Sequence, residues 1–360
     1  MKIVPVLLAG GIGERFWPMS RSTMPKQMLP LISSKSMIEE TLARVESFCT
    51  DGVKPLIVTG KAISGKIDER IGSAIAYDCI VEPVGKNTAP AVAAAAAFIR
   101  RTYGDAIMVI LSADHSISPV EDFLEAVGYA AKVAEKHDKL VLFGIKPTRP
   151  DTGYGYVKCG GQIESGDSVK GYDVSRFVEK PDAQKAEEYV QDDRFLWNSG
   201  MFVWKVSTIL EEFQRYMPDL FSRVLQLEEQ QFSRSAVDSF YRSVEKESID
   251  YGIMEKTHRV AVVCGAFSWD DIGSWESMSR LHPTDEKGTT VFGDKIFASG
   301  CSDSIVVNNS SLSVAALGVE NLVVVAVDDA VLVIPRDKLP DIKKYMAEMK
   351  SNASIPDTLF

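Results

Sequence analysis

Short apolar, β-branched runs alternate with helix-like stretches through the first part of this chain. The runs occupy residues 3–8, 56–59, 79–81, 107–111 and 140–143. Strands that alternate with helices are typical of a mostly parallel sheet covered by helices on both faces. The spacing therefore predicts an α/β fold, and it restricts ligands to the carboxyl ends of the strands, where such sheets bind them.

One of the intervening helices can be delimited closely. Asn87 or Thr88 can cap its N-terminus, Pro90 suits the first turn, and a run rich in alanine continues to Phe98 and stops by Gly104. The small side chains predict close packing of this helix against the sheet.

The pattern of residue types along the chain changes near Gly288. Short β-type runs follow at 304–308, 312–316, 322–327 and 330–335, separated by turn residues, and a helix is expected over 338–350. We predict a first domain over 1–282, a linker over 282–287, a small β-rich C-terminal domain over 288–350 and a frayed tail over 351–360. Exposed strand edges in the second domain would suit a homodimer.

A glycine-rich segment follows directly on the first apolar run. Gly10, Gly11 and Gly13 lie at the strand end, and Arg15 and Lys26 add two cations nearby. Backbone amides without side chains can wrap phosphate oxygens, and fixed cations neutralise them. The segment therefore predicts a site for a polyphosphate.

Two other phosphate-binding patterns fit less well. A dinucleotide fingerprint needs a third glycine where Phe16 stands. A second segment, 60–67, has the glycine and lysine spacing of a P-loop, but Ile67 offers no hydroxyl to a magnesium ion. Neither hydride transfer nor P-loop chemistry is favoured.

Composition restricts the partners and the compartment. The net charge of -10 over 360 residues argues against nucleic acid and acidic membranes. The five cysteines are widely spaced and the four histidines form no metal-binding pattern, which favours reduced thiols in a cytoplasm. The longest apolar stretch, 89–99, is too short to span a bilayer.

The segment from Gly10 to Lys26 resembles the signature loop of the sugar-nucleotidyltransferases. Residues 15–21 followed by 25–27 are similar to the mannose-1-phosphate guanylyltransferase branch, whereas Glu14 replaces a small hydroxylated residue. The resemblance extends from Met1 to about Tyr345 and implies a Rossmann-like nucleotidyltransferase domain. Many bacterial relatives carry an isomerase domain after this region, which we do not expect here.

The resemblance implies attack by a sugar 1-phosphate on the α-phosphorus of GTP, with pyrophosphate as the leaving group. The phosphate nucleophile is already anionic at neutral pH, so positioning and charge neutralisation suffice. Arg15, Lys26 and Lys180 are the expected catalytic cations. Mg²⁺ is the expected cofactor, and Asp114 and Asp271 are its expected ligands. The alternatives are that Asp114 caps the helix that follows it, and that Asp271 lies in a structural turn in which Asp270 caps the backbone.

The segment 82–90 resembles the base-reading loop of the guanylyltransferase branch. A carboxylate can accept two hydrogen bonds from guanine, so Glu82 is one candidate reader, and the loop backbone is the other. Lys86 replaces the arginine that is usual in this loop. The remaining nucleotide contacts are assigned to Gly85, Asn87 and Thr88.

Segments 152–156, 177–181 and 197–202 match the family in order and are expected to hold the sugar. Gly153, Glu179 and Asn198 would hold the hydroxyls, and Lys180 would neutralise the phosphate. Asp250 is expected to support this pocket without an assigned role.

The predicted function is synthesis of GDP-mannose and pyrophosphate from GTP and mannose 1-phosphate. Two alternatives stay open from the sequence, namely another hexose or heptose 1-phosphate, and a catalytically silent sugar-nucleotide sensor. Intact Arg15, Lys26, Asp114, Asp271 and Lys180 oppose the sensor, because a pure binder does not need to neutralise two reacting phosphates.

Overall fold

The computed structural model describes residues 1–72, 75–163, 169–352 and 354–360. These residues form two compact units. Unit 1 comprises 1–10, 41–113 and 117–269, and unit 2 comprises 11–40, 114–116 and 270–360. The glycine-rich loop thus begins where the chain first passes from unit 1 into unit 2. The linear division at residue 282 expected from the sequence stays a prediction.

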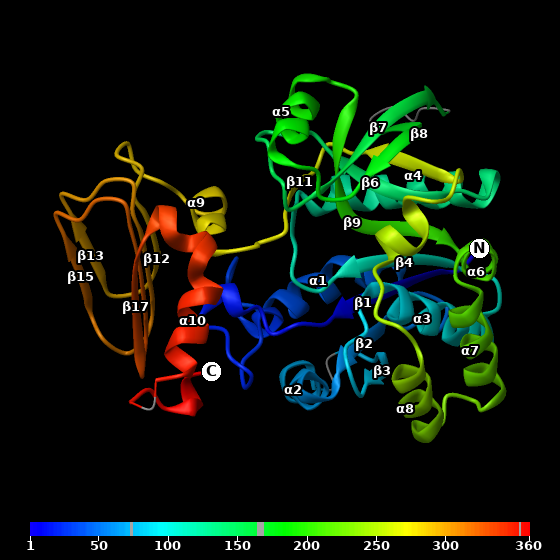
Figure 1. Cartoon of the computed structure of the whole chain (residues 1–360), viewed down its shortest axis with the longest axis horizontal. Helices are drawn as coiled ribbons and strands as arrows, with labels where there is room; N and C mark the ends of the chain where they lie inside the picture. The colour runs from blue at the N-terminus through cyan, green and yellow to red at the C-terminus, as the bar shows by residue number, and fades with distance from the viewer. Residues whose placement is uncertain (73–74, 164–168, 353) are drawn as a thin grey trace. The chain divides into compact units, whose positions relative to one another are not determined.

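Unit 1 is built on a large twisted sheet (Figure 1). Within the described residues its strand order is β3-β2-β1-β4-β9-β6-β10-β8-β7. The strands are β1 Ile3–Ala9, β2 Leu56–Gly60, β3 Asp78–Glu82, β4 Ile107–Ser112, β6 Leu140–Ile145, β7 Gly155–Gln162, β8 Lys170–Val178, β9 Phe195–Lys205 and β10 Val260–Cys264. The five runs expected from the sequence correspond to β1, β2, β3, β4 and β6.

The first half of this sheet is parallel. β1 pairs in parallel with β2 and β4, and β2 pairs in parallel with β3. β9 then enters antiparallel between β4 and β6, while β10 restores a parallel pair with β6. The predicted α/β class with a mostly parallel core is confirmed, whereas the antiparallel strands β7, β8 and β9 were not predicted.

Helices cover both faces of the sheet because its central strands are apolar on both sides. Val4 and Val6 of β1 lie in one core with α3 and α6, whereas α4 packs on the opposite face through Phe123, whose ring contacts Phe143 of β6. The helices of unit 1 are α2 Lys61–Ile71, α3 Thr88–Tyr103, α4 Val120–His137, α5 Ala183–Gln191, α6 Val206–Tyr216, α7 Pro218–Glu229 and α8 Arg234–Ser243, with short turns η3 Glu46–Phe48 and η4 Asp250–Met254.

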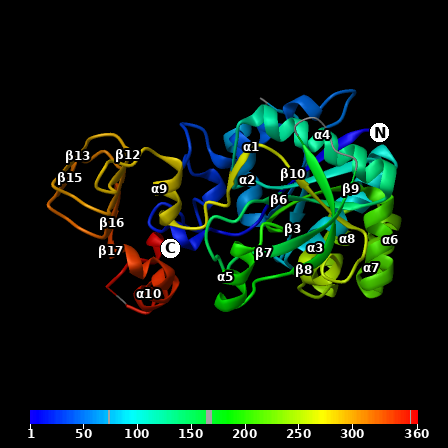
Figure 2. The same ribbon diagram turned by 90° about the horizontal axis from the view of Figure 1, so that it is seen from above.

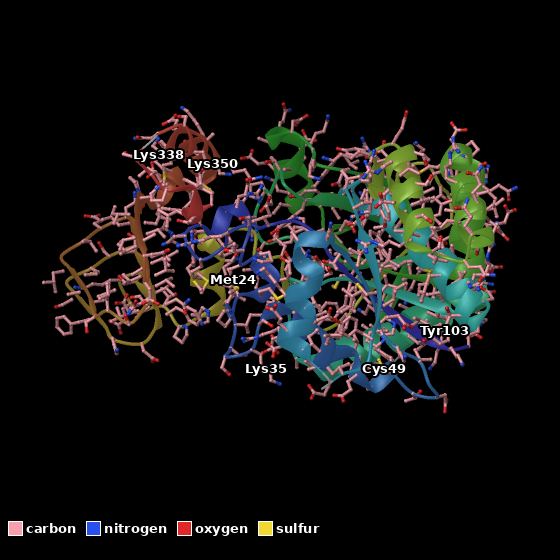
Figure 3. The ribbon with its side chains drawn as sticks, turned by 90° about the horizontal axis from the view of Figure 1, so that it is seen from below. Met24, Lys35, Cys49, Tyr103, Lys338 and Lys350 are labelled. Carbon is pink, nitrogen blue, oxygen red and sulfur yellow. The ribbon has the colours of Figure 1, made fainter. Side chains whose placement is uncertain are left out.

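The α3 helix forms as the sequence predicts. The Asn87 side chain caps it by accepting a hydrogen bond from the Thr88 amide at 2.9 Å, and Gly104 follows its last residue, Tyr103. Figure 3 labels Tyr103 at this helix end. Its alanines from Ala93 to Ala97 are fully buried, so the helix backbone lies close to the sheet.

Unit 2 contains stacked short strands and a C-terminal helix (Figure 2). Its strands are β12 Thr290–Gly293, β13 Ile296–Ser299, β14 Ile305–Asn309, β15 Val314–Leu317, β16 Leu322–Val327 and β17 Ala330–Pro335. β12, β14 and β16 pair in parallel, as do β13 and β15, so successive coils stack with one strand in each sheet. The last four strands match the predicted runs, while β12 and β13 were not predicted.

One face of the four-stranded sheet β12-β14-β16-β17 packs on the glycine-rich segment. Phe16 and Trp17 share a core with Val307 and Val325 of the sheet and with Ile342 of the C-terminal helix. The remaining elements of unit 2 are η1 Glu14–Phe16, η2 Lys26–Met28, η5 Trp275–Ser277, α9 Met278–Leu281, η6 Arg336–Asp341 and α10 Ile342–Lys350. The β-rich strands near the C-terminus therefore support a loop near the N-terminus of the chain.

The last residues were predicted to be frayed. The segment ends in the short helix η7 Asp357–Leu359, where the Leu359 carbonyl accepts a hydrogen bond from the Trp17 indole at 2.8 Å. The Phe360 carbonyl accepts one from the Ser22 hydroxyl at 2.7 Å.

Three remaining elements contain further points at which the chain passes between the units. They are α1 Met37–Val45, β5 Ser116–Ser118 and β11 Ser268–Asp270. Across the described residues, each helix is too short or too polar to cross a bilayer.

Candidate active site

The glycine-rich loop is held in shape by a close backbone approach. Gly13 has a φ of 77°, and a Cβ atom at this position would lie 2.3 Å from the Cβ of Lys26. The Lys26 amide also donates to the Ile12 carbonyl at 3.0 Å. Gly13 is therefore required for the chain to fold back on Lys26, whereas Gly10 and Gly11 have open space where a side chain would be.

Lys26 joins two other predicted site residues. It is 5% exposed, and its Nζ donates to Asp114 Oδ2 at 2.7 Å and to the main-chain oxygen of Asp271 at 2.8 Å. The ammonium also lies 5.7 Å from the centre of the Phe16 ring. Lys26, Asp114 and Asp271 belong to unit 2 although they are far apart in sequence. The structure thus brings the expected phosphate cation and both expected metal ligands to one place.

The neighbouring turn separates the two adjacent aspartates. Asp270 accepts hydrogen bonds from the Ile272 amide at 2.8 Å and from Arg280 at 2.5 Å, so its carboxylate is occupied in shaping the turn. Ile272 has a φ of 45°, an unfavourable value for a β-branched residue. The exposed Arg15 lies at the same turn, with Nη1 3.5 Å from the Gly273 carbonyl.

The donor set suits Mg²⁺. The ion takes oxygen ligands and usually one or two carboxylates together with substrate phosphates and water. The Asp114 carboxylate contacts the Lys26 ammonium, and Asp271, which contacts the same ammonium through its main-chain oxygen, carries a second carboxylate. No group of three or more His, Cys, Asp or Glu side chains that could enclose a metal occurs in the described ranges. A metal here would therefore depend on substrate oxygens.

Glu14, which departs from the family pattern, pairs with the C-terminal helix. Its carboxylate lies 3.8 Å from Lys343 Nζ and 3.7 Å from Lys350 Nζ, and Figure 3 labels Lys350 on α10. Nearby, Arg21 donates to both carboxylate oxygens of Asp329, at 2.7 and 2.5 Å. The two lysines of α10 therefore partner the negative charge at position 14.

The predicted base-reading loop lies in unit 1, after β3. Asn87 and Thr88 both have structural contacts here, because Asn87 caps α3 and the Thr88 hydroxyl accepts the Ile249 amide at 2.9 Å. The Lys86 ammonium donates to the Val244 carbonyl at 2.8 Å, and Gly85 has open space at its Cα. Their assignment as nucleotide contacts stays a prediction.

Glu82 is buried at the end of β3. It is 8% exposed, and its Oε1 has no hydrogen-bond partner. Burial raises the pKa of Glu82 to about 7, although the nearby Tyr241 hydroxyl acts to lower it. An unsatisfied buried acceptor is costly, so this carboxylate needs a donor or a proton.

The predicted sugar residues also lie in unit 1, around β7 and β9. Gly155 of β7 is paired with Asn198 of β9, and a Cβ on Gly155 would lie 2.4 Å from Glu179 Oε2. The absence of a side chain at Gly155 therefore lets Glu179 and Asn198 lie side by side. Sequence reasoning assigned sugar contact to Gly153, whose amide donates to Asp151 Oδ1 at 2.9 Å, and gave Gly155 no role.

Lys180 and Glu179 form an ion pair among the predicted sugar residues. Lys180 has a φ of 48° and donates to Glu179 Oε1 at 2.6 Å. Burial lowers the pKa of Lys180, but the hydrogen bond and charge of Glu179 leave it above its ordinary value. Glu179 Oε2 is buried and has no hydrogen-bond partner. The predicted sugar residues thus include a cation that keeps its charge and an acceptor oxygen that lacks a donor.

The site residues therefore form two sets. Gly11, Gly13, Arg15, Lys26, Asp114 and Asp271 belong to unit 2, and Gly10, the base-reading loop and the sugar residues belong to unit 1. Position in sequence could not have separated them, because the residues of unit 2 come from three distant segments.

Comparison with known proteins identifies two family models along the chain. The family model described as nucleotidyl transferase matches residues 4–288, and the one described as MannoseP isomerase/GMP-like beta-helix domain matches residues 300–349. A mannose-1-phosphate guanylyltransferase of Klebsiella pneumoniae is 37% identical over 97% of this chain and 74% of its own length. The xanthan biosynthesis protein XanB of Xanthomonas campestris is 38% identical over 97% of this chain and 73% of its own length.

A solved structure matches nearly the whole length of this chain. The protein described as mannose-1-phosphate geranyltransferase from Thermus thermophilus superposes with a TM-score of 0.85 and 32% identity, covering 98% of this chain and 100% of that one. Together with the family models, these matches show that the chain belongs to the nucleotidyl transferase family, in the branch of the mannose-1-phosphate guanylyltransferases.

Proposed function

We propose that this chain transfers GMP from GTP to mannose 1-phosphate by direct in-line attack with Mg²⁺, giving GDP-mannose and pyrophosphate. The observation that carries the proposal is the contact of Lys26 with both Asp114 and Asp271. A cation fixed between two carboxylate-bearing segments suits a reaction in which two anions must meet.

The nucleophile needs no general base. A phosphate monoester loses its second proton near pH 6, so the attacking oxygen already carries charge at neutral pH. The loop amides at Gly11 and Gly13, with Lys26 and Arg15, would neutralise and orient the triphosphate. A bound Mg²⁺ would take Asp114 and Asp271 as ligands and would supply further charge neutralisation and a template for the phosphates.

Sugar 1-phosphate recognition is assigned to Glu179, Asn198 and Lys180. Glu179 Oε2 lacks a donor, which a hexose hydroxyl would supply. The Lys180 ammonium keeps its proton and would neutralise the phosphate of the nucleophile. Gly153 would contribute backbone contacts, as the family pattern implies.

Guanine recognition is assigned to Glu82 together with the backbone near Gly85. The orphaned Oε1 of Glu82 can accept from the guanine N1 and N2 donors, a pair that adenine lacks. Asn87 and Thr88 would hold the loop and contact the nucleotide through their backbone.

We further propose a homodimer and a cytoplasmic setting. Phe297 and Leu317 lie on adjacent strands β13 and β15 and are 65% and 62% exposed, which is unusual for large apolar side chains gathered on one small sheet. A second copy of the chain would cover them. All five cysteines are unpaired, as expected of a reducing compartment.

Pyrophosphate release from GTP, Mg²⁺ and a panel of sugar 1-phosphates tests the reaction. We expect release with mannose 1-phosphate, strong loss in Asp114→Asn and Asp271→Asn, and unchanged release in the control Asp294→Asn, an exposed aspartate of unit 2. Release only with a different sugar 1-phosphate would identify that sugar as the substrate in place of mannose 1-phosphate. Absence of release with every sugar, alongside tight GDP-mannose binding, would identify a sensor instead.

A further inference from the structure

Asp250 makes a contact that fixes the orientation of a sugar-pocket residue. It begins the short turn η4, and its Oδ1 accepts a hydrogen bond from Asn198 Nδ2 at 2.9 Å. At the other end of the same amide, Asn198 Oδ1 accepts the Gly200 amide at 3.1 Å. Asn198 is 7% exposed. Both ends of its amide are therefore engaged, and the amide cannot turn over without losing two hydrogen bonds.

This orientation determines what Asn198 offers to a ligand. An amide nitrogen has two hydrogens, of which one is given to Asp250. The other remains beside Gly155, where the Asn198 Nδ2 and Glu179 Oε2 both lie near the missing side chain, at 3.5 and 2.4 Å from the position of a Cβ. One donor and one acceptor thus lie beside the same glycine, and a hydroxyl group, which both accepts and donates, is the ligand group that such a pair can engage.

Packing alone does not explain why a carboxylate occupies the buried position 250. Burial, followed by the charge of Glu179, raises the pKa of Asp250 to about 7, while Asn198 and Lys180 act to lower it. A carboxylate kept at this cost, where an apolar residue would fill the turn, indicates that its acceptor oxygen is needed.

We propose that Asp250 is a positioning residue for the sugar 1-phosphate, acting through Asn198 by keeping the free amide hydrogen beside Glu179 and Gly155. The proposal rests on the function proposed above. It assigns Asp250 no contact with the reacting atoms, so its effect should fall on sugar binding and not on the chemical step or on GTP.

Steady-state kinetics with each substrate varied in turn test this role. Because Asn198 would lose the buried hydrogen bond that holds its amide, we expect Asp250→Ala to raise the KM for mannose 1-phosphate about tenfold or more. The KM for GTP and kcat should change less than about threefold. Asp250→Asn keeps an oxygen in the same place and should return the sugar KM to within about threefold of the parent. Glu245→Ala, an exposed acid nearby in unit 1, is the matched control.

A double-mutant cycle separates positioning from a general structural role. If Asp250 acts through Asn198, the pair Asp250→Ala with Asn198→Ala should bind sugar no worse than Asn198→Ala alone. Additive losses would overturn the proposal, as would an Asp250→Ala protein that folds and keeps its sugar KM. If Asp250→Ala does not fold, Asp250→Ser removes the carboxylate with a smaller change and carries the same test. A parent chain without pyrophosphate release would instead refute the proposed function.

Discussion

Replacing Gly13 by alanine tests whether the glycine-rich loop is shaped by its contact with Lys26. Gly13 has a φ of 77°, a region that costs an L residue about 1 to 2 kcal/mol. The new Cβ would also lie 2.3 Å from the Lys26 Cβ, whereas carbon atoms in contact stay about 3.5 to 4.0 Å apart. Lys26 must therefore move by more than about 1 Å.

That movement would disturb a buried cation. Lys26 Nζ makes hydrogen bonds of 2.7 Å to Asp114 and 2.8 Å to Asp271, and the side chains of Lys26 and Asp114 are 7% and 28% exposed. Breaking a buried ion pair costs about 3 to 5 kcal/mol, and the lower end applies to the partly exposed Asp114. With the backbone cost, we expect Gly13→Ala to lower the free energy of unfolding by about 4 kcal/mol.

Gly318→Ala supplies the matched control. Gly318 belongs to the same unit, has a φ of 62°, and has no atom within 4 Å of the added Cβ. It should show only the backbone cost of about 1 to 2 kcal/mol. The difference between the two variants isolates the displacement of Lys26.

Urea unfolding followed by tryptophan fluorescence measures both variants, because Trp17 and Trp275 are buried in unit 2. Pyrophosphate release below the unfolding transition should fall about a hundredfold or more in Gly13→Ala, the scale of losing one charge-stabilising group, and little in Gly318→Ala. If Gly13→Ala were no less stable than Gly318→Ala and turned over normally, the assigned link between loop shape and Lys26 would be wrong.

Three further predictions concern buried carboxylates and the exposed apolar surface. Burial raises the pKa of Asp250 to about 7 in the folded chain, against 3.8 ordinarily, so the folded state binds an extra proton and its stability falls as pH rises from about 4 to 7. Asp250→Asn should therefore raise Tm more at pH 8 than at pH 5. An equal change at both pH values would contradict the assignment. Glu82→Gln should raise the KM for GTP about tenfold and weaken discrimination against ATP, and unchanged discrimination would assign base reading to the backbone. Phe297→Lys with Leu317→Lys should convert the dimer to a monomer in light scattering, and a parent chain that is already monomeric would refute the proposed interface.

Much of the local structure follows from the amino-acid sequence. The runs that became β1, β2, β3, β4 and β6 are short, apolar and bounded by turn residues, and the ends of α3 are specified by Asn87 and Gly104. These features depend on neighbours only a few residues away, so the side chains themselves specify them. The resemblance of the glycine-rich segment also led to the family that the comparisons show.

Of the strands that were not predicted in unit 1, β9 has long-range partners, whereas β7 and β8 pair with each other but lack a continuous apolar run. β9 pairs with β4 and β6, which both come much earlier in the sequence, and its apolar run resembles that of a buried parallel strand. In unit 2, β12 and β13 have only four residues each, and each belongs to a sheet through its pairing with a strand of the next coil. Strands of this kind become identifiable only through partners that the sequence does not place.

The site shows the same distinction between residue types and their placement. The sequence determined which groups are available, namely the glycines, Lys26, Asp114, Asp271, Glu179 and Asn198. Only the tertiary structure decided that Lys26 contacts both aspartates, that Glu14 pairs with lysines of α10, and that Asp250 orients Asn198. The physical reason is that chemical identity belongs to a single residue, whereas a hydrogen bond, an ion pair or a desolvated charge exists only where separate segments meet.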